Sequence, residues 1–230
     1  MTQPSPITRK KIYELVADYL VDEIGERRLA PGDVLPTERE LTETLRVGRS
    51  SVREALRMLE SQGLIRNGDS GLFTVAEPSN QLNRSLDLLL HLKEADLGEL
   101  YEIRRLLEGE FAALAAERRT KAQLAEMAAA IEAMRRSLED EEAYIEADLG
   151  FHVCIAEATG NRFAAHMMYA IRDVLRSGLR AVFESSPGIP ARSIEHHVGI
   201  SEAIAAGRAD DARTLMREHL SRVEHDARGF

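Results

Sequence analysis

The sequence predicts a mainly α protein in two parts: an N-terminal winged helix-turn-helix and a C-terminal all-α antiparallel bundle of six or seven helices. Apolar residues recur at helical spacing over most of the 230 residues. Turn residues divide the first 76 positions into three helices and a hairpin, and no strand pattern competes with helices after position 82. We therefore expect a DNA-binding domain at 8–76, a short linker at 77–81 and a helical domain at 82–228.

Three helices are expected in the first part. Apolar spacing predicts the first over 12–24, and a Pro-Gly turn breaks the chain after it. Thr37 is placed to cap the second helix, because Glu40 stands three residues later in the capping-box pattern. A third helix is expected over about 49–62, where Gly63 stops it.

Two short strands about a glycine-rich turn are expected next, at 64–66 and 72–75. This order of elements is that of a winged helix-turn-helix, in which the third helix enters the major groove of DNA. Arg49 and Arg53 lie on one face of that helix and suit guanine edges or phosphates, and Ser50 adds a short donor. The alternative is a solvated arginine face that is paired with neighbouring acids.

The distribution of charge permits DNA binding although the formal net charge is −9. Residues 1–76 hold 11 Lys and Arg against 12 Asp and Glu, whereas the rest of the chain holds 19 against 27. The segment 46–66 carries five arginines and two acidic residues. Most of the acidity therefore lies in the second part, and a local basic stripe remains on the first.

Two runs of the first part resemble the winged-helix domain of the GntR family of bacterial transcription regulators. They are LAPGDVLPTEREL at 29–41 and VGRSSVREALRMLE at 47–60, followed by GLI at 63–65. Position 48 is Gly where the family usually has Ser or Thr, and the wing carries an acidic Asp69. The resemblance implies a palindromic double-stranded DNA operator, contacted by Arg39, Arg49, Ser50, Arg53 and Gly68.

Helical spacing dominates the second part, and turn signals separate its helices. The expected helices are 82–92, 97–118, 121–139, 142–159, 161–184, 191–206 and 209–228. No apolar run reaches the length needed to cross a bilayer, and the N-terminus lacks the apolar core of a signal peptide. We therefore expect a cytoplasmic protein without a membrane partner, and the single Cys154 fits a reducing compartment as a small buried side chain.

A divalent-metal site is expected inside the bundle. Asp148 and His152 stand one turn apart on a helix, while His197 and His219 share helix faces with apolar residues. Together they would supply four nitrogen and oxygen ligands and leave positions open for water or a ligand. Zinc is the first expectation, with nickel, manganese or iron as alternatives. Each histidine also has a plain alternative, a core side chain satisfied by a backbone carbonyl.

The second part is similar to the effector domain, called FCD, of the FadR-type branch of the GntR family. LYEIRRLLE at 100–108, DLGFH at 148–152, ATGN at 158–161 and MREHL at 216–220 carry this similarity. It implies metal ligation by Asp148, His152, His197 and His219. It also implies an effector carboxylate that meets Arg104, with Asn161 in the same site. The alternative for Arg104 is a helical pair with Glu108, or a contact with the DNA-binding domain.

These features favour a ligand-responsive repressor, active as a homodimer and located on the nucleoid when bound to its operator. It would bind a divalent metal and a small carboxylate, and it would not be an enzyme. The chief alternative is a metal-dependent hydrolase or lyase with an accessory DNA-binding domain, for which Glu146 and Glu157 are the nearest acids. A third hypothesis is a structural DNA-binding protein whose histidines are core residues.

Overall fold

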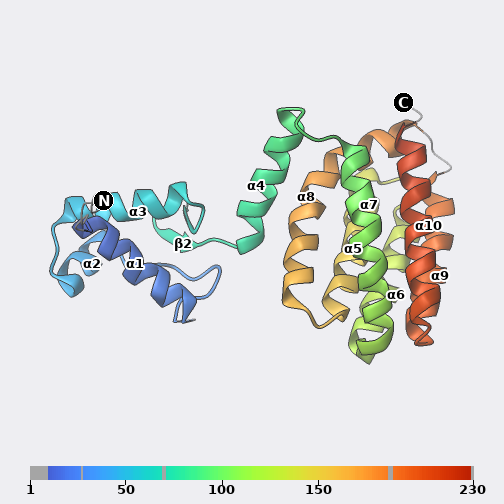
Figure 1. Ribbon diagram of the computed structural model, residues 1–230, viewed down its shortest axis with the longest axis horizontal. Helices are drawn as coiled ribbons and strands as arrows, with labels where there is room; N and C mark the ends of the chain where they lie inside the picture. Colours follow the sequence, from blue (N-terminus) through green and yellow to red (C-terminus); the bar gives the residue numbers. More distant parts are fainter. Residues whose placement is uncertain (1–9, 27, 69–70, 186–188, 229–230) are drawn as a thin grey trace, which may run out of the picture. The chain divides into compact units, whose positions relative to one another are not determined.

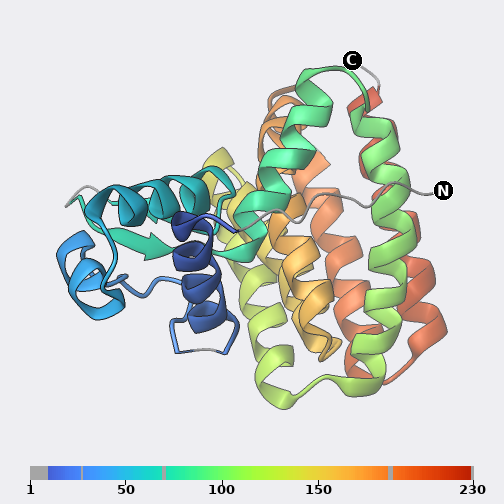
Figure 2. The same ribbon diagram turned by 60° about the vertical axis from the view of Figure 1, so that its left-hand side comes forward.

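The computed structural model describes residues 10–26, 28–68, 71–185 and 189–228. Its internal contacts divide the chain into two compact units, Met1–Gln81 and Leu82–Phe230. Figures 1 and 2 show both units from two directions. The elements run in the order α1 Ile12–Gly25, α2 Glu38–Leu45, α3 Arg49–Ser61, β1 Ile65–Asn67, β2 Phe73–Val75, α4 Pro78–His91, α5 Leu97–Arg118, α6 Lys121–Arg136, α7 Glu141–Ala158, α8 Arg162–Ser185, α9 Ile189–Ala205 and α10 Ala209–Arg228.

The first unit is a winged helix-turn-helix, which confirms the predicted fold class. Helix α3 packs against α1 and α2, and the antiparallel strands β1 and β2 pair Ile65 with Val75. One face of α3 is fully apolar and forms the centre of the core, so the opposite face of the same helix is left to solvent. The buried side chains of α3 are Val52, Ala55, Leu56 and Leu59.

Local signals fix the helix-turn-helix. The Thr37 hydroxyl accepts a hydrogen bond from the Glu40 amide at 3.3 Å, and the Glu40 carboxylate accepts from the Thr37 amide at 2.8 Å. Helix α2 ends at Arg46, which adopts a left-handed φ of 53°. Gly48 is the N-cap of α3 and offers no side-chain hydrogen bond to it. The departure from Ser or Thr at this position therefore leaves the first turn of α3 without a hydroxyl cap.

The second unit is an antiparallel helical bundle, as expected (Figures 1 and 2). Helix α5 packs against α7, α9 and α10, and further contacts join α6 to α7 and α9 to α10. The core between them is built mainly from Ala, Ile and Met side chains, with Phe151 and Tyr144 among them. Within the described part of the chain, no helix is long and apolar enough to span a membrane.

Helix α4 begins earlier than its apolar pattern indicates. The sequence predicts a start at 82, but the helix begins at Pro78, inside the segment expected as a linker. Proline suits the first helical position, since it lacks an amide hydrogen that would be unpaired there and its φ is already helical. The contact-based boundary between Gln81 and Leu82 therefore falls within a helix.

Candidate metal centre and DNA-binding face

The arginines expected to contact DNA lie on exposed positions. Arg49 and Ser50 form the first turn of α3, and Arg53 follows one turn later. The Arg53 guanidinium pairs with Glu38 of α2, with Nη2 3.0 Å from Oε2 and Nε 3.3 Å from Oε1. Exposed pairs of this kind contribute about 0–1 kcal/mol, so Arg53 can exchange Glu38 for a phosphate or a guanine at small cost.

The other two predicted DNA contacts lie on α2 and in the wing. Arg39 is exposed and reaches Glu43, with its Nη1 3.2 Å from Oε1. The Gly68 amide donates to the carbonyl of Leu72 at 2.8 Å, which closes the turn between the strands. Asp69, the acidic departure in the wing, lies outside the described residues.

The four predicted metal ligands come together in the bundle. Asp148 and His152 project from α7, His197 from α9 and His219 from α10. All four are buried, with exposed fractions of 7%, 1%, 0% and 2% in that order. One nitrogen from each histidine lies within 4.8 Å of the other two. The Asp148 Oδ1 atom lies 3.3 Å from Nε2 of His197.

Helical spacing explains why these side chains point inward. His197 shares its face of α9 with Ile200 and Ile204, both fully buried. His219 lies one turn after the buried Met216 on α10. Because helix faces repeat at three and four residues, burial of the apolar neighbours carries each imidazole into the core.

The buried imidazoles have unsatisfied nitrogens. Among the described residues, neither Nε2 of His152 nor Nδ1 of His219 has a hydrogen-bond partner, and Nε2 of His197 has no partner in hydrogen-bond geometry. Leaving a buried polar atom unpaired costs about 1–3 kcal/mol. The alternative of core histidines satisfied by backbone carbonyls does not account for the Nε2 atom of His152 or the Nδ1 atom of His219. A single cation would satisfy lone pairs on all three rings.

The electrostatics of the cluster suit a cation. Burial lowers the pKa of His197 and His219 well below the usual range, and mutual repulsion with the neighbouring His152 adds to this effect. Both rings are therefore neutral near pH 7, which is the form that coordinates metal. Burial raises the pKa of Asp148, while His152 and Arg104 oppose that rise. The Asp148 carboxylate is therefore not fully compensated by positive charge, and a divalent ion would supply that charge.

The distances between the three imidazole nitrogens also fit a zinc ion. A tetrahedral zinc with bonds of about 2.0–2.1 Å places its nitrogen ligands roughly 3.4 Å apart. The three imidazole nitrogens lie within 4.8 Å of one another, so each pair needs to approach by about 1.4 Å at most.

Arg104 is buried next to the histidines. It pairs with Glu108, which is the alternative that the sequence offered for this arginine. Its Nε donates to Oε1 of Glu108 at 2.6 Å, and its guanidinium lies 5.1 Å from the centre of the Tyr101 ring. The second oxygen of Glu108 lies 2.5 Å from Nδ1 of His152. Burial would raise the pKa of Glu108, but Arg104 and His152 hold it at about 2. Arg104 therefore connects to the histidine cluster through a carboxylate.

The sequence indicated Glu108 only as a possible partner of Arg104 and not as a residue of the histidine site. The spacing of four residues identifies it as a helical partner of Arg104. Its contact with His152 joins positions 44 residues apart and depends on the packing of α5 against α7. Arg104 and Glu108 stand four residues apart on a helix face with apolar neighbours. This pattern indicates a buried ion pair, and it is the sequence signal that could have identified Glu108 as a site residue.

Asn161 lies apart from the other predicted site residues. It is exposed and directly precedes α8, where its Oδ1 accepts a hydrogen bond from the Phe163 amide at 3.0 Å. The backbone amide of Asn161 donates to the Thr159 hydroxyl at 3.0 Å. These contacts are those of a helix cap, and the structure does not bring Asn161 to the histidines.

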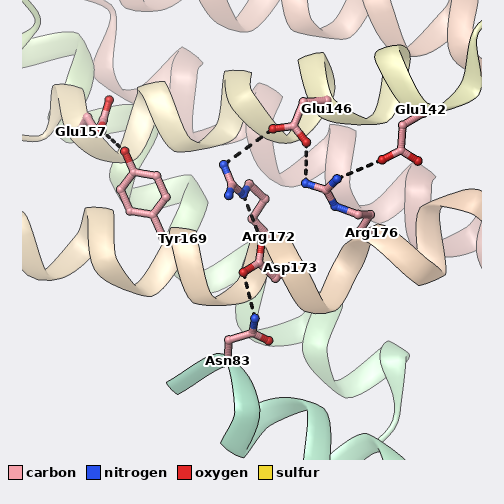
Figure 3. Close-up of polar contacts among 8 residues, drawn as sticks. All are labelled: Asn83, Glu142, Glu146, Glu157, Tyr169, Arg172, Asp173 and Arg176. Atoms are coloured by element: carbon pink, nitrogen blue, oxygen red, sulfur yellow. Dashed lines mark hydrogen bonds and ion pairs between the residues drawn. The ribbon is translucent and has the colours of Figure 1, made fainter. Parts of the chain in front are cut away.

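The acids considered for an enzymatic function are engaged elsewhere (Figure 3). Glu146 is exposed and pairs with Arg172 and Arg176 of α8, and Glu157 accepts from the Tyr169 hydroxyl. Burial raises the pKa of the Cys154 thiol to about 12, so this side chain is not a nucleophile at neutral pH. Neither glutamate is held as a general base for the cluster.

Comparison with known families assigns both parts of the chain. Residues 12–73 match the model of bacterial regulatory proteins of the gntR family, and residues 99–222 match the FCD domain. The HTH-type transcriptional regulator LutR of Bacillus subtilis is 34% identical over 214 residues, which span 90% of this chain and 97% of that protein. The HTH-type transcriptional repressor NanR of Cronobacter sakazakii is 32% identical and covers 95% of this chain and 86% of its own length.

A solved structure shares the fold. The structure described as Streptococcus agalactiae GntR superposes with a TM-score of 0.68 and is 24% identical in sequence. The match covers 93% of this chain and 99% of that one. LutR and NanR are thus transcription regulators, and the solved structure shows that the fold is shared.

The unpaired imidazole nitrogens lead us to a prediction about the free energy of unfolding. Replacing His219 with leucine, which has a similar volume, should stabilise the metal-free protein by up to about 1–3 kcal/mol, because a buried unpaired nitrogen is removed. The same His219→Leu change should abolish the rise in melting temperature on adding Zn²⁺, which the wild type should show. Thermal unfolding with a chelator and with Zn²⁺ measures both effects.

The matched control is His166→Leu, since His166 is an exposed histidine on α8. It should leave both the metal-free stability and the response to Zn²⁺ unchanged. Loss of stability in the metal-free His219→Leu protein, together with a preserved Zn²⁺ response, would show that this imidazole is an ordinary core residue.

Proposed function

Because the chain belongs to the GntR family of bacterial regulatory proteins and is a DNA-binding transcription regulator, we propose that it is a repressor controlled by a metal-bound organic acid. Its winged helix-turn-helix binds a palindromic operator through Arg39, Arg49, Ser50, Arg53 and Gly68. Its helical domain holds a divalent cation, zinc first, and a small carboxylate that changes operator affinity. Its curated relatives include the repressor NanR, which supports repression as the direction of control.

The observation that carries this proposal is the buried cluster of imidazoles with unpaired nitrogens. Histidines with unpaired nitrogens, next to a buried carboxylate, form the ligand set that zinc and related divalent ions prefer. A cation held there would supply a Lewis acid that binds a carboxylate oxygen of the effector. His152, His197, His219 and Asp148 hold it in place, and the surrounding apolar helices exclude water.

The balance of charge explains why the second ligand is an acid. Arg104 and Glu108 neutralise each other within the bundle. A divalent cation opposite the Asp148 carboxylate would leave one net positive charge in the interior. Buried charge is costly unless it is compensated, and one carboxylate supplies the compensation. Arg104 lowers the pKa values of His197 and His219, which supports a role for its guanidinium in binding such a ligand.

Control of DNA binding follows from thermodynamic linkage. An acid that binds one arrangement of the helical domain more tightly than another shifts the population toward that arrangement. Operator affinity then changes by the coupling factor between acid and operator, which is typically about 5- to 150-fold. The operator is chromosomal, so we place the working protein in the cytoplasm, on the nucleoid when bound.

We also propose that the chain acts as a homodimer, because a palindromic operator is read by two copies related by a two-fold axis. Exposed apolar side chains on α5 support this proposal. Ile103 is 49% exposed and Leu106 is 56% exposed, and they lie one turn apart on the same helix. A second copy of this chain would cover them.

Arg53 tests the DNA-binding face. The Arg53→Ala protein should bind operator DNA about 1–3 kcal/mol more weakly, because the change removes a bidentate donor to a base edge or a phosphate. Fluorescence anisotropy measures this, with an operator selected from random duplexes by the full-length protein. Arg136→Ala, an exposed change on α6, should leave the affinity unchanged. If Arg53→Ala and Arg136→Ala bind operator DNA with equal affinity, Arg53 is not part of the DNA interface.

The effector prediction uses acetate, glycolate, succinate and citrate as probes. At least one of these acids should change operator affinity by about 5- to 150-fold in the zinc-loaded protein, and a chelator should remove the response. Arg104→Lys keeps a positive charge next to Glu108 but loses the planar fork, so it should weaken the response. The proposal fails if no acid alters operator affinity, or if the response persists without metal.

The dimer prediction concerns α5. Replacing both Ile103 and Leu106 with glutamate should yield a monomer, since four buried carboxylates would repel one another across a two-fold interface. Sedimentation equilibrium should show a dimer for the wild type and for Leu138→Glu, a control at an apolar position that is 42% exposed after α6. A dimeric double variant would place the interface elsewhere.

A further inference from the structure

We infer that Glu108 is a positioning residue that sets the tautomer of His152 for metal binding and fixes the orientation of Arg104. One buried carboxylate thereby connects the metal site to the arginine that meets the effector. This inference rests on the proposed function and adds a residue to it. It concerns contacts already formed within the protein, before a metal or an acid binds.

Both oxygens of Glu108 are used, and each meets a different donor. Oε1 accepts from Nε of Arg104 at 2.6 Å, and Oε2 lies 2.5 Å from Nδ1 of His152. All three side chains are buried, with exposed fractions of 1–2%. Water therefore does not replace either partner, and the three groups form a continuous chain from α5 to α7.

The chemistry of a carboxylate fixes the proton on His152. An ionised carboxylate accepts hydrogen bonds and has none to donate, so Nδ1 of His152 must carry the hydrogen. In the neutral ring the lone pair then lies on Nε2, the atom without a partner among the described residues. This is the nitrogen that can ligate a cation shared with His197 and His219. Metal-binding histidines are commonly oriented by a carboxylate on their other nitrogen in this way.

The same carboxylate restricts Arg104. Pairing at Nε leaves the two terminal nitrogens of the guanidinium as the atoms that can meet another anion. The ring of Tyr101, 5.1 Å from the guanidinium carbon, packs against the same group. With Nε occupied and one side stacked, the guanidinium is held in one orientation before a ligand arrives, which reduces the entropy lost on binding.

No other residue type performs both tasks at this position. Glutamine offers a single acceptor oxygen and an amide that donates, so it can satisfy Arg104 or the Nδ1 hydrogen of His152 but not both. Aspartate keeps the charge but is one methylene shorter. The two donors require a carboxylate with the reach of glutamate.

Glu110 provides a matched control on the same helix. Its carboxylate also pairs with arginines, since Oε1 lies 2.8 Å from Nε of Arg213 and 3.0 Å from Nη2 of Arg217. It is half exposed, and its hydrogen bonds are to Arg213 and Arg217. Glu110→Gln therefore repeats the chemical change of Glu108→Gln without touching the cluster.

The first experiment titrates Zn²⁺ into full-length wild type, Glu108→Gln and Glu110→Gln in competition with a chromogenic chelator. The expected result is Zn²⁺ affinity about 10- to 100-fold lower for Glu108→Gln and unchanged for Glu110→Gln. Wild-type protein that binds Zn²⁺ no more tightly than Glu108→Gln would overturn the inference alone. Wild-type protein that binds no Zn²⁺ would overturn the proposed function and the inference with it.

The second experiment needs no variant of Glu108. The ¹⁵N chemical shifts of the seven histidines in metal-free wild type report which ring nitrogen carries the hydrogen, and His152→Gln identifies the signals of His152. The expected form has hydrogen on Nδ1 and a bare Nε2. Hydrogen on Nε2 with a bare Nδ1 would overturn the inference, and this readout decides the question even if Glu108→Gln fails to fold.

Discussion

Burial of charged and polar side chains in the helical domain is the constraint on which the rest of the structure depends. Arg104, Glu108 and Asp148 lie beside imidazoles in a core that is otherwise largely apolar. Charges removed from water must be compensated by partners of good geometry. Arg104 and Glu108 compensate each other, whereas Asp148 and the histidines do not reach full compensation within the described residues. In the proposed function, a bound cation and an anionic ligand would complete this balance of charge, so that the stability of the domain depends on its effector.

Local signals in the sequence account for the parts of the fold that were predicted correctly. The capping box at Thr37 and the apolar face of α3 are properties of short segments, so they can be read without knowledge of tertiary contacts. The inward direction of His197 is readable for the same reason, since Ile200 and Ile204 share its face. The start of α4 at Pro78 was missed because the apolar pattern begins later than the helix itself.

Contacts between helices could not be predicted from the sequence. The spacing of Arg104 and Glu108 indicates a pair, but the second bond of Glu108, to His152, exists only because α5 packs against α7. Likewise, neighbouring acids on α3 were considered as partners for the arginines of that helix, while the structure pairs Arg53 with Glu38 of α2. In both cases the residue type was evident, and its partner depended on which elements meet in space.

In the proposed function, imidazoles from three helices, α7, α9 and α10, hold a divalent cation. X-ray absorption at the zinc edge of the full-length, zinc-loaded protein tests this coordination. We expect three imidazole nitrogens and oxygen donors at about 2.0–2.1 Å. A first shell with sulfur at about 2.3 Å, or with fewer than three imidazoles, would contradict the assignment of His152, His197 and His219 as the metal ligands.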